Sequence, residues 1–266
     1  MISDFSQSEL LRYSKQILLP QVGIDGQRKL KQASVLIIGV GGLGSPISLY
    51  LAAAGIGRIG IVDPDRVSLS NLQRQVLYSF NTVGEMKVEA AKQRLTGLNP
   101  CCQIDIFPVA FTSENAKEIA DGFNILVDGT DNLTTRYLIN DLCVRTARPF
   151  VFGAIQGFDG QMALFDSRIG PCYRCVFGSP PPSDHIPLPA DSGVFGVLAG
   201  LVGLLQAAEI IKIILGIGET LGGKLVLINS LTAEFDHIEV LKDPSCPVCG
   251  ESPEIKARNW SSASLL

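Results

Sequence analysis

A buried strand followed by a glycine loop constrains the fold of this chain more than any other feature. The segment Ser34–Ile38 is apolar after its first residue, and lysines precede it while glycines follow it. An uninterrupted apolar run of this length is typical of a parallel strand that is covered on both faces. A helical pattern then continues to Ala54, and a second apolar run follows at Arg58–Val62. The sequence therefore predicts a strand-helix-strand unit of the mononucleotide-binding kind.

The glycines between the first strand and the helix favour a bound phosphate chain. Gly39, Gly41 and Gly44 have the G-x-G-x-x-G spacing, which lets a ligand approach the free N–H groups at a helix N-terminus. The same glycines could instead serve only the tight packing of helix on strand. Asp63 follows the second strand, 19 residues after Gly44, at the position from which a carboxylate binds ribose hydroxyls. Together these residues predict a nucleotide site without saying which nucleotide binds.

Strands and helices alternate to about residue 150, and shorter strands punctuated by glycine follow. This pattern predicts an α/β fold: a Rossmann-like, doubly wound, mainly parallel sheet that antiparallel strands extend. We expect an N-terminal helical arm at 1–30, a nucleotide-binding half at 31–150, a second half of the same sheet at 151–250, and a tail at 251–266. The further expected helices are 8–16, 85–95, 113–121, 132–147 and 194–215, and the further expected strands are 103–109, 124–127, 150–153, 160–166, 224–229 and 235–241.

Composition and charge exclude several classes of partner. With 22 Lys and Arg against 26 Asp and Glu, the net charge is -4, and the chain lacks the long basic run that nucleic-acid binding needs. The polar N-terminus lacks the basic start and apolar stretch of a signal peptide, so we expect a cytoplasmic protein. The uncharged stretch 192–208 contains four glycines and leads into Gln206, Glu209 and Lys212. We interpret it as a buried core or interface helix, not a membrane span.

Two cations and one carboxylate are candidates for handling a polyphosphate. Arg74 lies in the segment Asn71-Leu-Gln-Arg-Gln75, and Lys87 follows shortly after it. An arginine fork and a lysine point charge together can clamp a polyphosphate and stabilise the negative charge that leaves it, although either residue alone could be a solvated surface group. Asp131 belongs to an acidic segment directly after a buried strand, where a carboxylate can hold Mg²⁺.

Four of the seven cysteines form two Cys-x-x-Cys pairs, Cys172 with Cys175 and Cys246 with Cys249. Two such pairs in a cytosolic chain predict a tetrahedral zinc site with four thiolates. Such a site has no open coordination position, so its role would be structural; a redox dithiol is the main alternative. We expect the remaining three cysteines to be apolar packing groups, because nothing near them in sequence would lower their pKa: Cys101, Cys102 and Cys143.

The ordered set of these motifs resembles the HesA/MoeB/ThiF family of adenylyltransferases, which are relatives of ubiquitin-activating enzymes. The resemblance runs from about residue 8 to 250. It implies ATP- and magnesium-dependent adenylation of the C-terminal glycine carboxylate of a ubiquitin-like sulfur carrier, which ends in Gly-Gly, as in molybdopterin or thiamin biosynthesis, with a separate sulfur donor. The motifs that carry it are Arg12-Tyr-Ser-Lys-Gln16, the loop Gly39–Gly44, the segment Ser70–Gln75, Lys87, Asp128-Gly-Thr-Asp-Asn132 and the two cysteine pairs.

The resemblance also implies a role for each matching position. By position, Gly41 and Gly42 would approach the phosphates and Asp63 would bind the ribose. Asn71, Arg74 and Lys87 would hold the triphosphate, with Gln75 beside them. Asp131 would bind magnesium. The half 151–250 would bind the carrier and contain the zinc site.

The sequence departs from the family at two positions. Family members that form a covalent carrier intermediate have a cysteine in the loop before the long apolar helix, where this chain has Pro189, and no cysteine occurs between residues 176 and 240. We therefore expect the acyl-adenylate to be the product. The family's second arginine in Arg-Tyr-x-Arg-Gln is Lys15 here. In the family that residue reaches the ATP of the neighbouring subunit, so we expect a homodimer with Lys15 acting in trans.

Three other functions fit part of the sequence. A relative of the family could adenylate the C-terminus of a different peptide. An NAD-dependent oxidoreductase would also use the glycine loop and Asp63. A non-catalytic half of an activating heterodimer would keep the fold, but the presence of Arg74, Lys87 and Asp131 argues against it.

Overall fold

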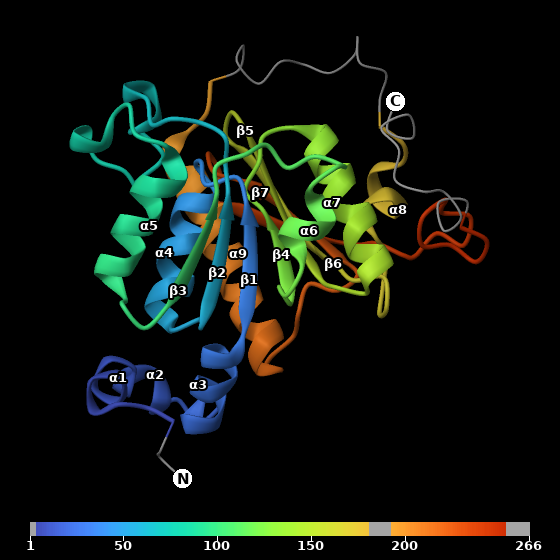
Figure 1. The fold of residues 1–266 in the computed structure, drawn as a ribbon. Helices are drawn as coiled ribbons and strands as arrows, with labels where there is room; N and C mark the ends of the chain where they lie inside the picture. Colours follow the sequence, from blue (N-terminus) through green and yellow to red (C-terminus); the bar gives the residue numbers. More distant parts are fainter. Residues whose placement is uncertain (1–3, 181–192, 254–266) are drawn as a thin grey trace.

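One twisted sheet organises the protein in the computed structural model, which describes residues 4–180 and 193–253. Within these residues eight strands lie in the order β3-β2-β1-β4-β5-β6-β7-β8 (Figure 1). The first five are mutually parallel and the last three are antiparallel. The predicted fold class is therefore confirmed. The strands are β1 (Ser34–Ile38), β2 (Arg58–Val62), β3 (Gln103–Phe107), β4 (Ile125–Asp128), β5 (Phe150–Gln156), β6 (Asp159–Phe165), β7 (Lys224–Asn229) and β8 (Glu234–Glu239).

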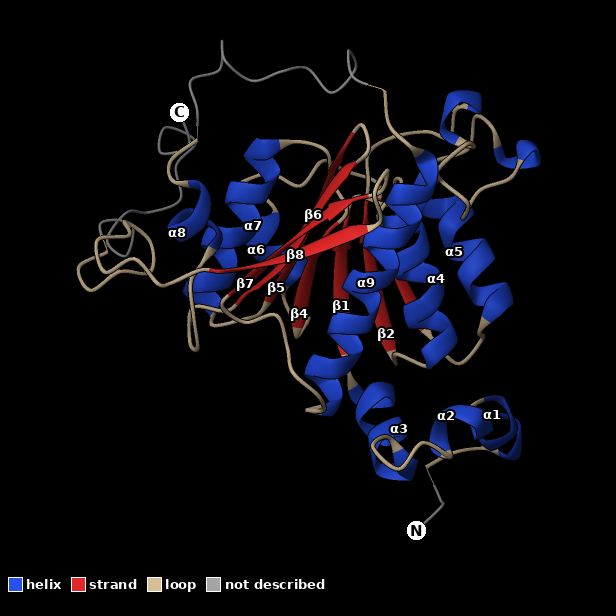
Figure 2. Ribbon diagram, turned by 180° about the vertical axis from the view of Figure 1, so that it is seen from behind, coloured by secondary structure: helices blue, strands red, loops and turns tan. Residues whose placement is uncertain are grey.

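Helices cover both faces of the parallel part, which is why its strands are apolar on both sides. All five residues of β1 are buried; Val35 and Ile37 pack into one core, and Leu36 and Ile38 pack into the other. Figure 2 shows α4, α5 and α9 in front of the sheet and α6 and α7 behind it. The helices of the two layers are α4 (Gly44–Ala54), α5 (Lys87–Leu98), α9 (Gly196–Leu215), α6 (Ala116–Ala120), α7 (Leu133–Thr146) and α8 (Tyr173–Phe177).

The N-terminal arm differs from the single helix predicted at 8–16. It forms α1 (Gln7–Arg12) and α2 (Ser14–Ile17), which are separated at Tyr13. The helix breaks there because the Tyr13 ring is buried and its hydroxyl accepts a hydrogen bond of 2.8 Å from Asn99. A third helix, α3 (Gly23–Gln32), was not predicted, since two glycines and a mostly polar sequence obscure its apolar face.

The arm lies beyond the amino ends of the strands, at the bottom of Figure 1, and contacts the ends of three core helices. The carbonyls at a helix C-terminus have no partner inside the helix, so side-chain donors placed there stabilise it. Each of these contacts ends on the last residue of a helix: Arg12 Nη1 donates to Leu98 O (2.8 Å), Gln27 Nε2 to Ala54 O (2.9 Å) and Lys29 Nζ to Leu215 O (2.9 Å).

Helix α9 is long and apolar enough to cross a membrane by length and composition alone, with a mean hydropathy of 2.0. In the structure it packs along α4, β5 and β6, and its buried polar side chains, Gln206 and Glu209, each make a hydrogen bond, although Gln206 Oε1 has no partner among the described residues. Gln206 Nε2 donates to Asp128 O (2.9 Å), and Glu209 accepts from the backbone N–H of Leu221 (2.6 Å). A Cβ at Gly203 would lie 2.6 Å from Leu43 O, so glycine allows α9 to approach α4 closely.

Several boundaries differ from the prediction for local reasons. β3 ends at Phe107 because Pro108 follows, and α5 begins at Lys87 because the backbone before it pairs with Val67. α6 and β8 are shorter than predicted, and two 3₁₀ turns, Leu69–Asn71 and Phe80–Thr82, lie in the loop after β2. Pro189 and most of the predicted tail lie outside the described residues.

Candidate functional site

Most of the predicted site residues lie in three loops at the carboxyl ends of β1, β2 and β4. β1 is the strand where the chain's order in the sheet reverses, with β2 on one side and β4 on the other. Loops that leave such a strand and its neighbour diverge, which opens a crevice for a ligand at the carboxyl edge. The three loops are 39–44, 63–86 and 129–132, and they meet at the top of the sheet in Figure 1.

The glycines of the first loop divide into two groups. Gly39 has φ +85°, and a Cβ there would lie 2.7 Å from Gly129 O, while a Cβ at Gly44 would lie 2.2 Å from Gly39 O. These two glycines allow close packing of backbone on backbone. A Cβ at Gly41 would contact only Gln75 Nε2, at 3.5 Å, so the backbone of Gly41 is the part of the loop that a ligand can approach. The packing and binding interpretations therefore apply to different glycines.

Asp63 ties the glycine loop to the end of β2. It is 5% exposed; its Oδ2 accepts from Val40 N (2.9 Å) and its Oδ1 from Asp65 N (2.9 Å). Burial raises the pKa of Asp63, and Lys87 together with these two N–H groups opposes the rise. Because both oxygens already accept a backbone hydrogen bond, any ribose contact would use their remaining lone pairs.

Lys87 is held beside Asp63 by a second acid that the sequence analysis missed. Its Nζ lies 2.8 Å from Asp65 Oδ2 and 3.9 Å from Asp63 Oδ1. Lys87 is buried, whereas the Asp65 side chain is 63% exposed. A phosphate chain that met Lys87 would replace Asp65 as its partner. The pattern Asp63-Pro64-Asp65 was the available signal, because it places a second carboxylate two residues after the first.

Arg74 and its neighbours form a turn on the other side of the glycine loop. The backbone N–H groups of Arg74 and Gln75 donate to Asn71 O, at 3.1 and 2.9 Å. Arg74 Nη1 donates to Ser70 O (3.2 Å), and its Cδ lies 3.6 Å from the position of a Cβ on Gly42. Gln75 is 4% exposed, and its Oε1 has no hydrogen-bond partner among the described residues. A buried acceptor without a partner beside an open glycine fits a ligand or water that donates to it.

The two acids after β4 differ in what surrounds them. Asp128 is fully buried and accepts from Thr130 N (2.8 Å) and from Arg136 Nε (2.8 Å). Burial raises the pKa of Asp128, and the charge of Arg136 opposes the rise. Asp131 is exposed, and in residues 4–180 and 193–253 it has no hydrogen bond or ion pair. Asp131 is thus the carboxylate available for a cation, and Arg136, on the first turn of α7, was missed by the sequence analysis.

Lys15 does not join the other candidate residues in the same chain. It is an exposed residue of α2, in the arm at the amino edge of the sheet. Arg74, Lys87 and Asp131 belong to the opposite edge (Figure 1). A contribution of Lys15 to the site therefore requires a second chain.

The four cysteines of the two pairs come together as predicted. Their Sγ atoms all lie within 4.8 Å of one another, with Cys172 to Cys246 at 3.7 Å and Cys175 to Cys249 at 3.4 Å. A tetrahedral zinc with Zn–S bonds of about 2.3 Å sets its sulfurs about 3.8 Å apart, so the cluster fits zinc. The hydrogen bond between the Cys172 and Cys175 side chains lowers the pKa of Cys175 to about 5, and the Asp243 N–H donates to the Cys175 sulfur.

The remaining cysteines lie outside the three loops. Cys143 is buried within α7, and burial raises its pKa. Burial also raises the pKa of Cys102 to about 12, while Cys101 is exposed at the turn before β3. The structure therefore places no thiol of these three beside the glycine loop.

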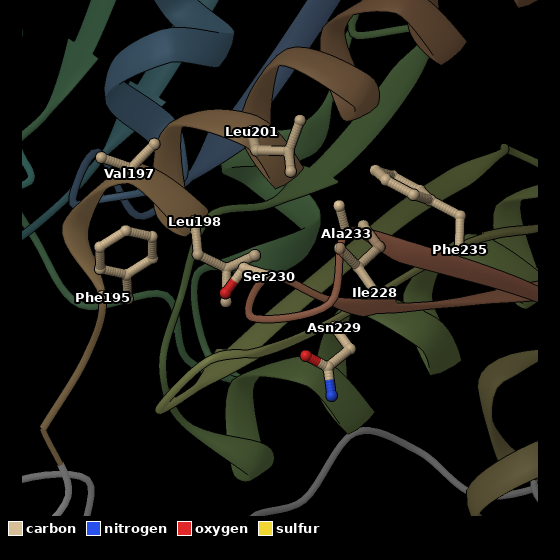
Figure 3. A pocket seen from close by; sticks show the side chains of 9 residues that line it. All are labelled: Phe195, Val197, Leu198, Leu201, Ile228, Asn229, Ser230, Ala233 and Phe235. Atoms are coloured by element: carbon tan, nitrogen blue, oxygen red, sulfur yellow. The ribbon is translucent and has the colours of Figure 1, made fainter.

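An apolar cleft adjoins the site across the first turn of α9 (Figure 3). A Cβ at Gly196 would lie 3.3 Å from Arg74 Cβ, so this turn separates Arg74 from the cleft. The cleft has a volume of about 170 Å³. It is lined by Phe195, Val197, Leu198, Leu201, Ile228, Asn229, Ser230, Ala233 and Phe235.

Known proteins are similar to this chain in sequence and in fold. A sulfur carrier protein adenylyltransferase of Thermus thermophilus is 51% identical over 254 residues, which is 94% of each chain. The adenylyltransferase and sulfurtransferase MOCS3 of Anopheles gambiae is 45% identical over 96% of this chain, and the match spans 58% of that protein. Among solved structures, E. coli MccB with ATP superposes with a TM-score of 0.79 at 28% identity, over 90% of this chain and 74% of that one.

A model of the ThiF family matches residues 13–248, which include the arm from Tyr13, the three loops and three of the four clustered cysteines; Cys249 is the next residue after this range. This range covers most of the chain. The protein belongs to the ThiF family.

Proposed function

We propose that this protein uses ATP to adenylate the C-terminal glycine carboxylate of a ubiquitin-like sulfur carrier protein. The observation that carries the proposal is the grouping of Arg74, Lys87 and Asp131 around the open side of the glycine loop. The carrier carboxylate attacks the α-phosphorus of ATP, and pyrophosphate leaves. The protein needs only to align the two substrates and to stabilise the charge that develops, so no protein nucleophile is required.

The chain's own residues would divide this work. The backbone at Gly41 and Gly42 borders the phosphate chain, and Asp63 contacts the ribose. Lys87 exchanges Asp65 for a phosphate oxygen, while Arg74 approaches the phosphates from the other side. Both cations would stabilise the departing pyrophosphate. Asn71 and Gln75 support the Arg74 turn, and the unpartnered Gln75 Oε1 accepts a hydrogen bond from a bound group or water.

Asp131 would hold Mg²⁺, because it is the exposed carboxylate of the loop after β4. Magnesium supplies charge neutralisation at the phosphates when it is bound. The role of the protein here is to hold the Asp131 carboxylate near the phosphate chain.

The body of the carrier would dock in the half 151–250, over the apolar cleft beside Arg74. The cleft presents Phe195, Val197 and Phe235 at the surface, each more than 40% exposed. A protein seated there can extend its C-terminal tail past the first turn of α9 to the glycine loop. The carrier-binding half predicted from the sequence thus acquires a specific surface.

Two relatives bear on the choice of substrate. MccB has been solved with ATP and with AMPCPP and MccA, so it represents the alternative in which another peptide is the substrate. The higher identity, 51% against 28%, is to the sulfur carrier enzyme, which favours a carrier. Membership of an adenylyltransferase family replaces the NAD-dependent oxidoreductase considered from the sequence.

The product would leave as an acyl-adenylate that an external sulfur donor attacks. The buried thiols Cys102 and Cys143, whose pKa values burial raises, are poor nucleophiles, and Cys101 lies near the opposite edge of the sheet. The four clustered cysteines would hold a structural zinc. A homodimer in the cytoplasm, with Lys15 acting in trans, completes the proposal.

Exchange of labelled pyrophosphate into ATP tests this function, with each candidate carrier added in turn. We expect exchange that requires both Mg²⁺ and one carrier, and that is lost when the last glycine of that carrier is deleted. Exchange with an unrelated peptide but with no carrier would favour the MccB-like alternative. Exchange with neither would refute adenylation.

A further inference from the structure

The segment between the first two clustered cysteines reaches into the helix that follows the Asp131 loop. Tyr173 N donates to Asn140 Oδ1 (2.8 Å). Arg174 forms a fork on Asp141, with Nε to Oδ1 and Nη2 to Oδ2 both at 2.8 Å. We call residues 172–175, which include the start of α8, the zinc loop. The zinc loop therefore binds the side chains of Asn140 and Asp141, two consecutive residues in the middle of α7.

These contacts fix α7 strongly because they are buried. The side chains of Arg174 and Asp141 are 7% and 8% exposed, and breaking a buried ion pair leaves an uncompensated charge. The Arg174 guanidinium also lies 4.7 Å from the centre of the Tyr137 ring. The Tyr173 ring packs edge-on against Tyr137 and Phe152, at centroid distances of 5.1 and 5.3 Å.

The first turn of α7 in turn fixes the loop that carries Asp131. Asn132 caps the helix by accepting from Thr135 N (2.8 Å). Arg136 Nε donates to Asp128 Oδ2 (2.8 Å), and its Nη2 donates to Thr130 O (2.9 Å), the carbonyl directly before Asp131. Both ends of the loop therefore depend on the position of α7.

Tyr173 also connects the zinc loop to the surroundings of Arg136 without passing through α7. The guanidinium of Arg136 lies beside the Tyr173 hydroxyl. Arg136 also lies over the Phe152 ring, 5.5 Å from its centre, and Phe152 contacts Tyr173. The zinc loop thus contacts the surroundings of Arg136 directly as well as through α7.

We propose that the zinc loop positions Asp131, with Arg174 and Tyr173 as positioning residues that act through α7 and Arg136. The inference rests on the proposed function, since it takes Asp131 as part of the adenylation site. A shift of the loop by about 1 Å is enough to lower a rate by up to roughly 100-fold. The four-cysteine cluster then supports the site from a distance, although its sulfurs do not touch the substrate.

The first test replaces Arg174 by lysine, which keeps the charge but loses the fork. We expect carrier-dependent pyrophosphate exchange to fall roughly 10-fold, with the apparent KM for Mg²⁺ raised, in protein that retains its zinc and its cooperative unfolding. Arg168→Lys is the matched control: Arg168 forms a similar fork on Asp166, and among the described residues it has no hydrogen bond or ion pair with α7. We expect less than a twofold change in the control.

A double-mutant cycle with Asp131→Asn separates positioning from general weakening. If Arg174 acts through Asp131, Arg174→Lys has less than a twofold further effect once Asp131 has lost its charge. An equal loss in both backgrounds overturns the inference. Full exchange in Asp131→Asn alone would instead refute the role of Asp131 in the proposed function, so the two failures are distinguishable.

Hydrogen exchange without nucleotide gives a readout that does not depend on activity. We expect amides of residues 129–136 to exchange faster in Arg174→Lys and to be unchanged in Arg168→Lys. Tyr173→Phe is the second variant, because it keeps the packed ring and removes only the hydroxyl; Tyr137→Phe, in the same aromatic cluster, is its control. Unchanged exchange of this segment in both zinc-loop variants overturns the inference.

Discussion

Polar groups at the amino ends and at the carboxyl ends of the parallel strands differ in whether the protein itself provides their hydrogen-bond partners. We call these two ends the amino edge and the carboxyl edge. At the amino edge the arm supplies a side-chain donor to the last carbonyl of α4, α5 and α9. At the carboxyl edge the Gln75 Oε1 acceptor has no partner among the described residues, and Asp131 is exposed. The carbonyls at a helix C-terminus need hydrogen-bond partners, and at the amino edge side chains of the arm provide them. In the proposed function, a bound nucleotide supplies the partners that the carboxyl edge lacks.

The same comparison explains why Lys15 is unusual. The arm residues Arg12, Gln27 and Lys29 donate hydrogen bonds to the ends of core helices, whereas Lys15 has no hydrogen bond or ion pair within residues 4–180 and 193–253. The comparison therefore predicts which substitutions change stability, which change chemistry, and which one acts across two chains.

The largest expected effect belongs to neither edge. Cys249→Ser removes one of four clustered ligands, and a structural zinc contributes on the order of 10 kcal/mol, which is comparable to the stability of a domain. We expect less than one zinc per chain, a markedly lower melting temperature and poor expression, measured by metal analysis and thermal unfolding. Cys101→Ser, at an exposed cysteine outside the cluster, is the control. One zinc per chain with an unchanged melting temperature would mean that the cluster does not support the fold.

At the carboxyl edge, Arg74→Ala and Lys87→Ala should each slow adenylation by roughly 10²- to 10³-fold, the usual cost of removing one preorganised charge. The check is carrier-dependent pyrophosphate exchange at saturating ATP. Arg74→Ala should leave the melting temperature nearly unchanged, because the side chain donates only to Ser70 O in the structure. Lys92→Ala, on the exposed side of α5, controls for loss of a lysine charge. Normal turnover in both variants would contradict the proposal that Arg74 and Lys87 bind the polyphosphate.

At the amino edge, Gln27→Ala should have the opposite profile. Gln27 is fully buried and donates to Ala54 O, where Gln16 also donates at 3.1 Å. Because one donor to this carbonyl remains, we expect a loss of about 1–2 kcal/mol, seen as a melting temperature lowered by about 3–6 °C. The rate per folded molecule should be unchanged. A rate loss comparable to that of Arg74→Ala would break the distinction between the two edges.

The sequence predicted the elements around β1 closely because their patterns are local. The bounds of β1 and β2 and the end of α4 match the prediction, since uninterrupted apolar runs and glycines mark them. α3 was missed because its buried face includes Gly26 and Gln27, which do not read as an apolar stripe. α8 was missed because it has only five residues, too few for a helical pattern, and includes one of the paired cysteines.

The sequence could name candidate residues for the site, but it could not predict how they are arranged. Arg74, Lys87 and Asp131 follow from motifs, whereas the partner of Lys87 depends on how the loop after β2 folds back against α5. The ion pair between Asp128 and Arg136 joins residues eight apart across a loop and a helix start. Such pairings are set by tertiary packing, and no pattern in the sequence distinguishes the buried Asp128 from the exposed Asp131.

The smallest expected effect is the recovery of activity when two different subunits, one of them changed at Lys15, form a heterodimer. Lys15 lies at the edge opposite Arg74 and Lys87, so a Lys15 that serves catalysis must serve the site of another subunit. Mixing an inactive Lys15→Ala subunit with an inactive Lys87→Ala subunit should then restore activity. In each heterodimer one site has lost both cations and the other has kept both, so recovery should reach about half of the wild-type rate per dimer.

Verified heterodimers are essential to this experiment, because a tight dimer would not exchange its subunits. Co-expression with two different affinity tags supplies them, and pyrophosphate exchange measures the recovery. The control pairs Arg74→Ala with Lys87→Ala, which lie at the same edge of one chain and so leave every site defective. Recovery in the first pair alone supports a site completed in trans. If the Lys15→Ala and Lys87→Ala heterodimer is as inactive as its parents, Lys15 does not complete the neighbouring site, and the contrast between the two edges would then hold within each chain alone.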